Sequence, residues 1–239
     1  MFPGIGTLIN LGAIIFGSAI GRIGGTRIPE RIRKLITDVL GCITLISAAA
    51  GIRELWSQDF VAATVQGGPI LVVLVSLIIG AVIGSLMDID SRLAQFGELL
   101  KARFGGGQRG FVEGFVTASL IFAIGPLAIL GSISDGMGTG IEQLLLKSTL
   151  DFFAAIAFSA AFGIGVALSI LPVGLYQGVW TLIGLSLGSI LNPAQVAAMT
   201  SVGGVLLIGI GLKLLELKTI SVANLLPALA VAPLVLLVF

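Results

Sequence analysis

The sequence predicts an all-α, polytopic membrane protein, and three observations support that fold class. The chain of 239 residues is 56% hydrophobic and 10% charged, whereas a soluble domain has roughly 25% charged residues. Its mean hydropathy is strongly positive, at +1.15. Eight apolar stretches follow one another, each close to the roughly 20 residues that a membrane-spanning helix needs. Because the hydrophilic segments between them are short, residues 1–239 are expected to form one transmembrane domain.

The predicted spans begin almost at the N-terminus. The first apolar run lacks both a basic flank and a small-residue cleavage site, so a retained span is expected there and not a signal peptide. In the second half of the chain, Pro172, Pro193 and Pro227 interrupt the apolar pattern, and a span could be split or re-entrant there. The eight predicted spans are residues 4–22, 35–53, 69–87, 111–132, 149–170, 172–191, 196–213 and 220–239.

The distribution of basic residues predicts the orientation of these spans. If the N-terminus lies outside, the inward connectors carry eleven lysine and arginine residues, whereas the outward connectors carry two, Arg53 and Lys147. Cytoplasmic loops of membrane proteins carry the excess of basic residues. Both termini are therefore expected outside. The eleven inward residues are Arg22, Arg27, Arg31, Arg33, Lys34, Arg92, Lys101, Arg103, Arg109, Lys213 and Lys218.

Small residues recur every four positions in three of the spans. At this spacing they lie on one helix face and let another backbone approach closely, which is how many membrane helices pack. The first, third and fifth spans are therefore predicted to pack together. Similar spacings after residue 170 could face a neighbouring subunit, and a homo-oligomer is expected. The three ladders of small residues are Ala13, Gly17 and Gly21; Ser76, Gly80 and Gly84; and Ala155, Ser159, Gly163 and Ala167.

Two of the ladder spans are followed by basic amphipathic connectors, at residues 28–36 and 91–104. In the second connector, Leu93, Phe96 and Leu100 share one face, as in a helix that lies at the membrane interface. The pattern suggests a repeated two-helix hairpin, in parallel units because each unit contains an even number of spans. The alternative is that the ladders serve packing alone.

The fourth predicted span is broken at Gly125-Pro126. A proline removes one backbone donor and frees the carbonyl group one turn earlier. Inside a bilayer, these groups need partners in protein or in a water-lined cavity. Together with Ser132 and Asp135, the break gives a polar strip of the kind with which transporters bind ions or charged groups. The alternative is a packing kink, with Asp135 as a solvated residue at the end of the span.

Acidic and amide residues inside other spans favour the functional interpretation. Asp151 lies about one turn inside the fifth predicted span, while Asn10, Gln177 and Asn224 lie within or at the ends of other spans. Ionisable residues at membrane depth are costly and usually line a cavity or pair with another group. Carboxylate and amide oxygens suit a cation such as sodium, and the same carboxylate could carry a proton. Alternatively, Lys147 forms an i,i+4 ion pair with Asp151 at the membrane surface.

Several other functions lack support in the sequence. The chain has no histidine and a single cysteine, Cys42, which excludes an internal disulfide, a zinc site and a histidine proton relay. A net charge of +1 without a basic patch gives no sign of nucleic-acid binding. No nucleophile is paired with a base, and neither HExxH nor GxSxG occurs. We therefore expect no enzymatic activity, no cofactor and no metal site.

Six short motifs are distributed over nearly the whole chain. They are GTLIN at 6–10, GPLAILGSISDG at 125–136, KSTLD at 147–151, LPVGLYQG at 171–178, GGVLLIGIGL at 203–212 and ANLLPAL at 223–229. Together they resemble the YdfK/YqgA-like bacterial membrane proteins, domain of unknown function 554, and the Gly-Pro stretch is the most specific part. The resemblance implies an integral membrane or transport protein of a bacterial inner membrane, without an established activity. Lys213 departs from the family pattern, in which asparagine is expected after GIGL, so no site is assigned to it.

These observations predict a membrane transporter of a small solute or a monovalent cation, embedded in the lipid bilayer. Asp151 is expected to couple transport to a cation or proton, the amide residues to supply neutral ligands, and the broken span to supply exposed backbone. Two alternatives are a membrane scaffold that associates through its glycine ladders, and a channel with a pore on the symmetry axis of a ring. The predicted site consists of Asp151, Asn10, Gln177, Asn224, Gly125, Pro126, Ser132 and Asp135.

Overall fold

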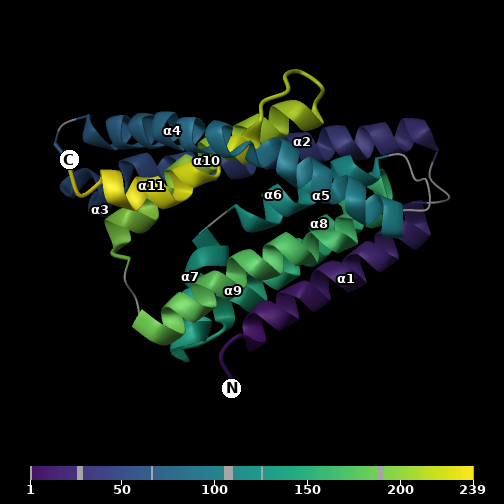
Figure 1. The fold of residues 1–239 in the computed structure, drawn as a ribbon, viewed down its shortest axis with the longest axis horizontal. Coiled ribbons are helices and arrows are strands. Elements are labelled where there is room, and N and C mark those ends of the chain that lie inside the picture. The colour runs from purple at the N-terminus through teal and green to yellow at the C-terminus, as the bar shows by residue number, and fades with distance from the viewer. Residues whose placement is uncertain are drawn as a thin grey trace. The chain divides into compact units, whose positions relative to one another are not determined.

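Every regular element of the described chain is helical, which confirms the all-α prediction (Figure 1). The structure is a computed structural model, and it describes residues 2–25, 29–65, 67–104, 110–124, 126–187 and 191–238. The α-helices are α1 (Ile5–Gly25), α2 (Glu30–Ile52), α3 (Gln58–Ala62), α4 (Gly68–Met87), α5 (Ile89–Phe104), α6 (Phe111–Ala123), α7 (Pro126–Met137), α8 (Glu142–Phe162), α9 (Ile170–Leu187), α10 (Pro193–Leu214) and α11 (Pro227–Val235). The 3-10 helices are η1 (Arg53–Trp56), η2 (Ile164–Ser169) and η3 (Val222–Leu225).

The helices account for all eight predicted apolar stretches. Among the described residues, six helical segments are long and apolar enough to cross a membrane: α1, Glu30–Trp56, α4, α8, Ile164–Ser186 and α10. The pair α6 and α7 forms a seventh when it is counted as one span, and the shorter apolar helix Val222–Val235 lies where the eighth was predicted. The chain is thus a membrane protein with several transmembrane helices.

The break in the fourth span lies between α6 and α7, whose axes differ by 62°. α7 begins at Pro126, a position where proline forfeits no hydrogen bond because the first N–H groups of a helix have no intrahelical partner. Gly125, the other residue of the predicted break, lies outside the described residues. The proline therefore starts a new helix instead of kinking a continuous one.

The fifth span begins earlier than predicted. The expected span at 149–170 is found as α8, which starts at Glu142 and ends at Phe162. Glu142 in the first turn complements the positive end of the helix dipole, and Gly163 ends the helix with a φ of 87°, which glycine adopts without steric cost. Lys147 therefore lies inside a helix, and its assignment to an outward connector is wrong. Asp151 consequently lies near the middle of the helix instead of one turn from its start.

The chain divides into two compact units, and the first comprises Met1–Leu40, Ala94–Ala123 and Leu127–Ile190. We call it unit 1. Its centre is the pair α1 and α8, which run parallel and side by side (Figure 1). A Cβ atom on Gly17 or Gly21 of α1 would collide with the carbonyl oxygens of Phe152 and Ile156 in α8. Glycine is thus required for this close approach, as the ladder pattern predicted. α6, η2 and α9 pack around the pair.

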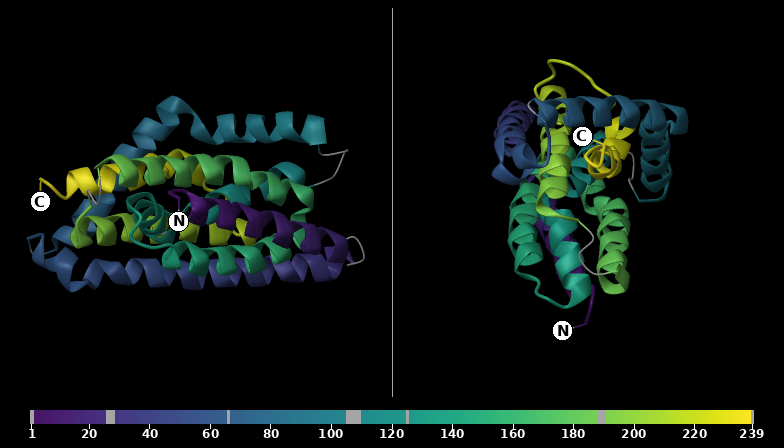
Figure 2. Two further views of the ribbon diagram at one scale, coloured as in Figure 1. Left: turned by 90° about the horizontal axis from the view of Figure 1, so that it is seen from below. Right: turned by 90° about the vertical axis from the view of Figure 1, so that its left-hand side faces the viewer.

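The second unit, unit 2, comprises Gly41–Leu93, Ile124–Pro126 and Leu191–Phe239. Here α4 and α10 pack against α11, and in the right-hand view of Figure 2 the yellow α11 lies beneath the blue α4. The glycine ladder of α4 faces this partner, since added Cβ atoms on Gly80 and Gly84 would meet Ala228 and Asn224. Of the three predicted ladder helices, α1 and α8 therefore pack on each other through their ladders. The expectation that the ladder of α4 joins them is wrong, because α11 and η3 occupy it.

The amphipathic connector at 91–104 forms α5, as its pattern predicted. Part of its apolar face contacts protein. The ring of Phe96 packs edge-on against Phe115 of α6, with 5.9 Å between the ring centroids, and Leu100 is buried. This face is therefore partly a packing surface within unit 1.

Candidate functional site

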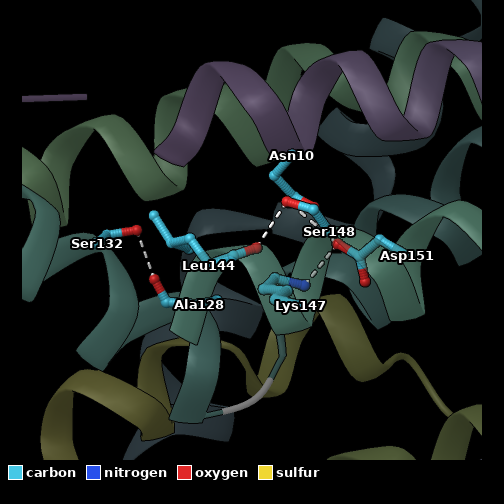
Figure 3. A network of polar contacts seen from close by, with 7 residues as sticks. All are labelled: Asn10, Ala128, Ser132, Leu144, Lys147, Ser148 and Asp151. Atoms are coloured by element: carbon cyan, nitrogen blue, oxygen red, sulfur yellow. Dashed lines mark hydrogen bonds and ion pairs between the residues drawn. The ribbon is translucent and has the colours of Figure 1, made fainter. Parts of the chain in front are cut away.

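Asp151 is the centre of a buried polar cluster in unit 1 (Figure 3). Its carboxylate Oδ2 accepts a hydrogen bond from Lys147 Nζ at 2.7 Å and another from Asn10 Nδ2 at 3.0 Å. The side chains of Lys147 and Asp151 are only 7% and 9% exposed, and Asn10 is fully buried. The i,i+4 ion pair considered from the sequence therefore exists, but protein encloses it within an apolar helix.

Local helix geometry creates this cluster. Residues 147 and 151 are one turn apart on the same face of α8, so their side chains meet. Asn10 reaches the carboxylate from the second turn of α1, because α1 runs parallel to α8 at close range. A buried charge is tolerated only when it is paired and hydrogen-bonded. The three side chains therefore form one unit that links the two helices.

Asp135 has a different role. It is 2% exposed in α7, and its Oδ2 accepts hydrogen bonds from the backbone N–H groups of Gly6 at 2.9 Å and Thr7 at 3.4 Å. These groups belong to the first turn of α1, where N–H donors lack intrahelical partners and the helix dipole favours a negative charge. Asp135 therefore caps α1 from another helix. It is not the solvated residue that the alternative interpretation of the break placed at this position.

Gln177 lies on α9 and is fully buried. Within the part of the chain that the structure describes, neither its Nε2 nor its Oε1 has a hydrogen-bond partner, and the same holds for Asn10 Oδ1. One turn further along α9, the hydroxyl of Thr181 lies 3.4 Å from that of Thr7 in α1. The faces of α1 and α9 that meet here are thus polar in an otherwise apolar pair of helices.

The other predicted site residues have partners elsewhere. Ser132 is buried in α7 and donates to Ala128 O at 2.6 Å, one turn earlier in its own helix (Figure 3). Asn224 belongs to unit 2, where its Oδ1 accepts from the backbone N–H of Asp90 at 2.8 Å and caps the start of α5. Pro126 begins α7, and Gly125 lies outside the described residues. Of the predicted ligands, the structure brings Asn10 into contact with Asp151.

Lys147 is the principal residue of the cluster that was not among the predicted ligands. Its sequence signal was ambiguous, because a lysine four residues before an aspartate suits a membrane surface as well as a buried pair. The three leucines at 144–146 are the sequence feature that indicates a helix start upstream of Lys147, because they continue the apolar run. Among the described residues, no group of three or more histidine, cysteine, aspartate or glutamate side chains is placed to hold a metal ion.

Comparison with known proteins assigns the chain to a family. The family model for proteins of unknown function DUF554 matches residues 5–237. The chain is 31% identical to the uncharacterized membrane protein YdfK of Bacillus subtilis (strain 168), over 98% of this chain and 96% of YdfK. It is 28% identical to the uncharacterized protein YqgA of Escherichia coli (strain K12), over 95% of this chain and 94% of YqgA. No solved structure matches the chain significantly. The chain, a membrane protein with a buried Lys147–Asp151 pair, belongs to the DUF554 family.

Proposed function

We propose that this protein transports a small solute or ion across a bacterial plasma membrane, and that Asp151 couples the movement to a proton or a monovalent cation. The observation that carries the proposal is the Lys147–Asp151 ion pair, which is almost fully buried within an apolar helix. A buried ion pair contributes little to stability compared with apolar packing. Ionisable residues at membrane depth commonly mark ion pathways and proton relays.

Lys147 holds the position that a coupling ion would take. Its ammonium group lies 2.7 Å from Asp151 Oδ2, so a cation or proton that binds this oxygen competes with it. Once displaced, the ammonium group must find another partner or lose its proton, because an unpaired buried charge is strongly unfavourable. The carboxylate therefore exchanges one positive partner for another. Asn10, as a neutral donor, can remain bonded to the carboxylate in either state.

The same carboxylate is well placed to transmit the exchange to the helices. Through Asn10 it joins α1 to α8 about two turns before their close contact at Gly17. Ligands shift a conformational equilibrium only by their differential affinity for the two states. A partner at Asp151 that favours a different spacing of α1 and α8 would therefore move this interface, which is the kind of step that alternating access requires.

The thermal stability of the detergent-purified protein tests the proposal. We would measure the unfolding midpoint in sodium, potassium and choline chloride from about pH 5 to about pH 8, for wild type and Asp151→Asn. A ligand that binds only the folded state raises its stability by mass action. We expect one cation, or the acidic end of the range, to raise the midpoint of wild type selectively and to have no such effect on Asp151→Asn.

Asp135→Asn is the matched control, because it neutralises a second buried carboxylate that caps a helix. It should lower the midpoint in every salt alike and keep the selective response. If wild type and Asp151→Asn respond identically to every condition, the ion pair is structural. The scaffold interpretation would then replace the transporter.

A further inference from the structure

The unpartnered amide of Gln177 is the most unusual buried group in unit 1. The residue is fully buried, yet within the described residues neither its donor nor its acceptor atom is hydrogen-bonded to protein. Native proteins pair buried polar groups with other protein groups or with ordered water. A primary amide has four hydrogen-bonding positions, so it is an expensive side chain to place in such surroundings for packing alone.

Helix packing places Gln177 on the stretch of α9 that meets the turns of α1 around Asn10. Gly174, Gln177 and Thr181 lie at positions i, i+3 and i+7, along one face of α9. Two of them touch α1: Thr181 Oγ1 is 3.4 Å from Thr7 Oγ1, and a Cβ atom on Gly174 would lie 3.1 Å from Leu11 Cδ1. Gln177 lies between these two contacts. It is therefore level with residues 7–11 of α1, which include Asn10.

The orientation of the Asn10 amide follows from its neighbour. Nδ2 faces Asp151 Oδ2 at 3.0 Å, and the reverse orientation would set an amide oxygen against a carboxylate oxygen. Asn10 Oδ1 is therefore the atom left without a partner among the described residues. Two acceptors, Asn10 Oδ1 and Gln177 Oε1, and one donor, Gln177 Nε2, thus belong to neighbouring turns of α1 and α9.

We propose that Asn10 and Gln177 form a neutral binding site next to the ion pair, for a small uncharged molecule that offers two hydrogen-bond donors and one acceptor. A terminal –C(=O)NH2 group, as in urea and primary amides, has this set, and so does water. The Lys147–Asp151 pair is internally neutralised, so it adds no net charge that would require a charged ligand. The site adds a solute class to the proposed transport function. Binding at the site does not depend on that function, but passage of the solute does.

Gln177→Met tests the site, because methionine has nearly the same size and no hydrogen-bonding amide. If a polar molecule satisfies Gln177, the variant loses those hydrogen bonds and unfolds at a lower temperature than wild type. If the amide is dry, removing it relieves an unsatisfied group, and the midpoint stays equal or rises. Gly178→Ala is the control on the same helix, since an added Cβ there meets nothing within 4 Å, and we expect it to match wild type.

Proteoliposome fluxes identify the bound molecule. Stopped-flow light scattering would follow water flux under a sucrose gradient and urea flux under a urea gradient, at equal protein density. We expect wild type to raise urea flux several-fold over protein-free liposomes, and Gln177→Met to lose that increase. Loss of a water flux alone would identify water as the occupant of the same site.

An equal or raised midpoint for Gln177→Met overturns the site. A lowered midpoint with neither flux changed overturns the passage of urea or water through it, and with it the proposed solute class. The cation response of Asp151 is a separate measurement on a different variant. Failure of the neutral site is therefore distinguishable from failure of cation coupling. Gln177→Met should keep the cation response even where it loses urea or water flux.

Discussion

The two units of this protein use the same packing device around different interiors. In each unit a ladder of small residues brings one helix against a partner, α1 against α8 in unit 1 and α4 against η3 and α11 in unit 2. Among the described residues, every fully enclosed charged or amide side chain belongs to unit 1. In the described part of unit 2, the buried polar side chains all carry hydroxyl groups; they are Thr44, Ser76 and Ser201. Close packing therefore does not require buried charge in this fold.

This difference separates packing from function. Ser76 and Ser201 donate to carbonyl oxygens one turn earlier in their own helices, so these two buried hydroxyl groups of unit 2 are satisfied locally. In unit 1, buried amide and carboxylate groups also make polar contacts between helices, from Asn10 to Asp151 and from α1 to Asp135. The Lys147–Asp151 pair has no buried counterpart in the described part of unit 2, so it is the feature of unit 1 that needs a functional explanation.

The largest expected effect comes from breaking the ion pair. Lys147→Met leaves the Asp151 carboxylate buried without its cation, and removal of one partner of a buried pair costs about 3–5 kcal/mol of stability. The free energy of unfolding in detergent would measure this loss. The double variant Lys147→Met/Asp151→Asn removes both charges and should recover most of it, because a neutral pair leaves no uncompensated charge.

A double variant as unstable as Lys147→Met would contradict this account, since the loss would then come from packing of the lysine stem. A matched control comes from unit 2. Ser76→Ala removes a buried polar group of α4 without leaving a charge, and it should leave the protein close to wild type.

The second prediction compares two helix caps, one in each unit. Asp135 is buried and caps α1 with a carboxylate, whereas Asn224 is partly exposed and caps α5 with a neutral amide. Asp135→Ala should cost about 2 kcal/mol, because a charged cap on a buried helix start lies at the upper end of the range. Asn224→Ala should cost about 1 kcal/mol or less, since water can replace a part-buried cap. Urea unfolding at constant protein concentration would measure both.

Equal losses for the two variants would show that burial and charge add nothing to the cap. A larger loss for Asn224→Ala would reverse the comparison. In that case unit 2, and not unit 1, would depend on polar contacts between its helices.

The sequence predicts the helices well because the apolar period and length of a span are local properties. All eight stretches have helical counterparts, and the ladder at Gly17 and Gly21 correctly marks a close helix contact. The partner of each ladder is not a local property. Nothing in residues 76–84 distinguishes α8 from α11 as a partner, so the prediction that three ladders meet was wrong.

The site was predictable in part for the same reason. Asp151 and Asn10 stand out as polar residues in apolar runs, and they do meet. Lys147 was assigned to a connector, because a charged residue usually marks the end of a span. The helix in fact starts at Glu142, which puts Lys147 one turn before Asp151 on the same helix face, where the two charges pair. Asp135 and Asn224 both resemble ligands in sequence, but the groups that they cap come from residues more than a hundred positions away.

The smallest expected effect comes from removing one serine hydroxyl group from each of two ladders. Ser159 of α8 donates to Ser18 O of α1 at 2.8 Å, whereas Ser76 of α4 donates to Val72 O of its own helix at 2.6 Å. Hydrogen bonds between membrane helices contribute about 0.6 kcal/mol on average, so Ser159→Ala should lose about that amount. For Ser76→Ala we expect a change within about 0.5 kcal/mol, because its hydroxyl bonds to a carbonyl group of its own helix. The two variants remove the same atom from equivalent ladders, and the free energy of unfolding in detergent would measure both losses. A larger loss for Ser159→Ala would assign the difference to the hydrogen bond between helices. Equal losses would show that this hydrogen bond adds nothing to stability.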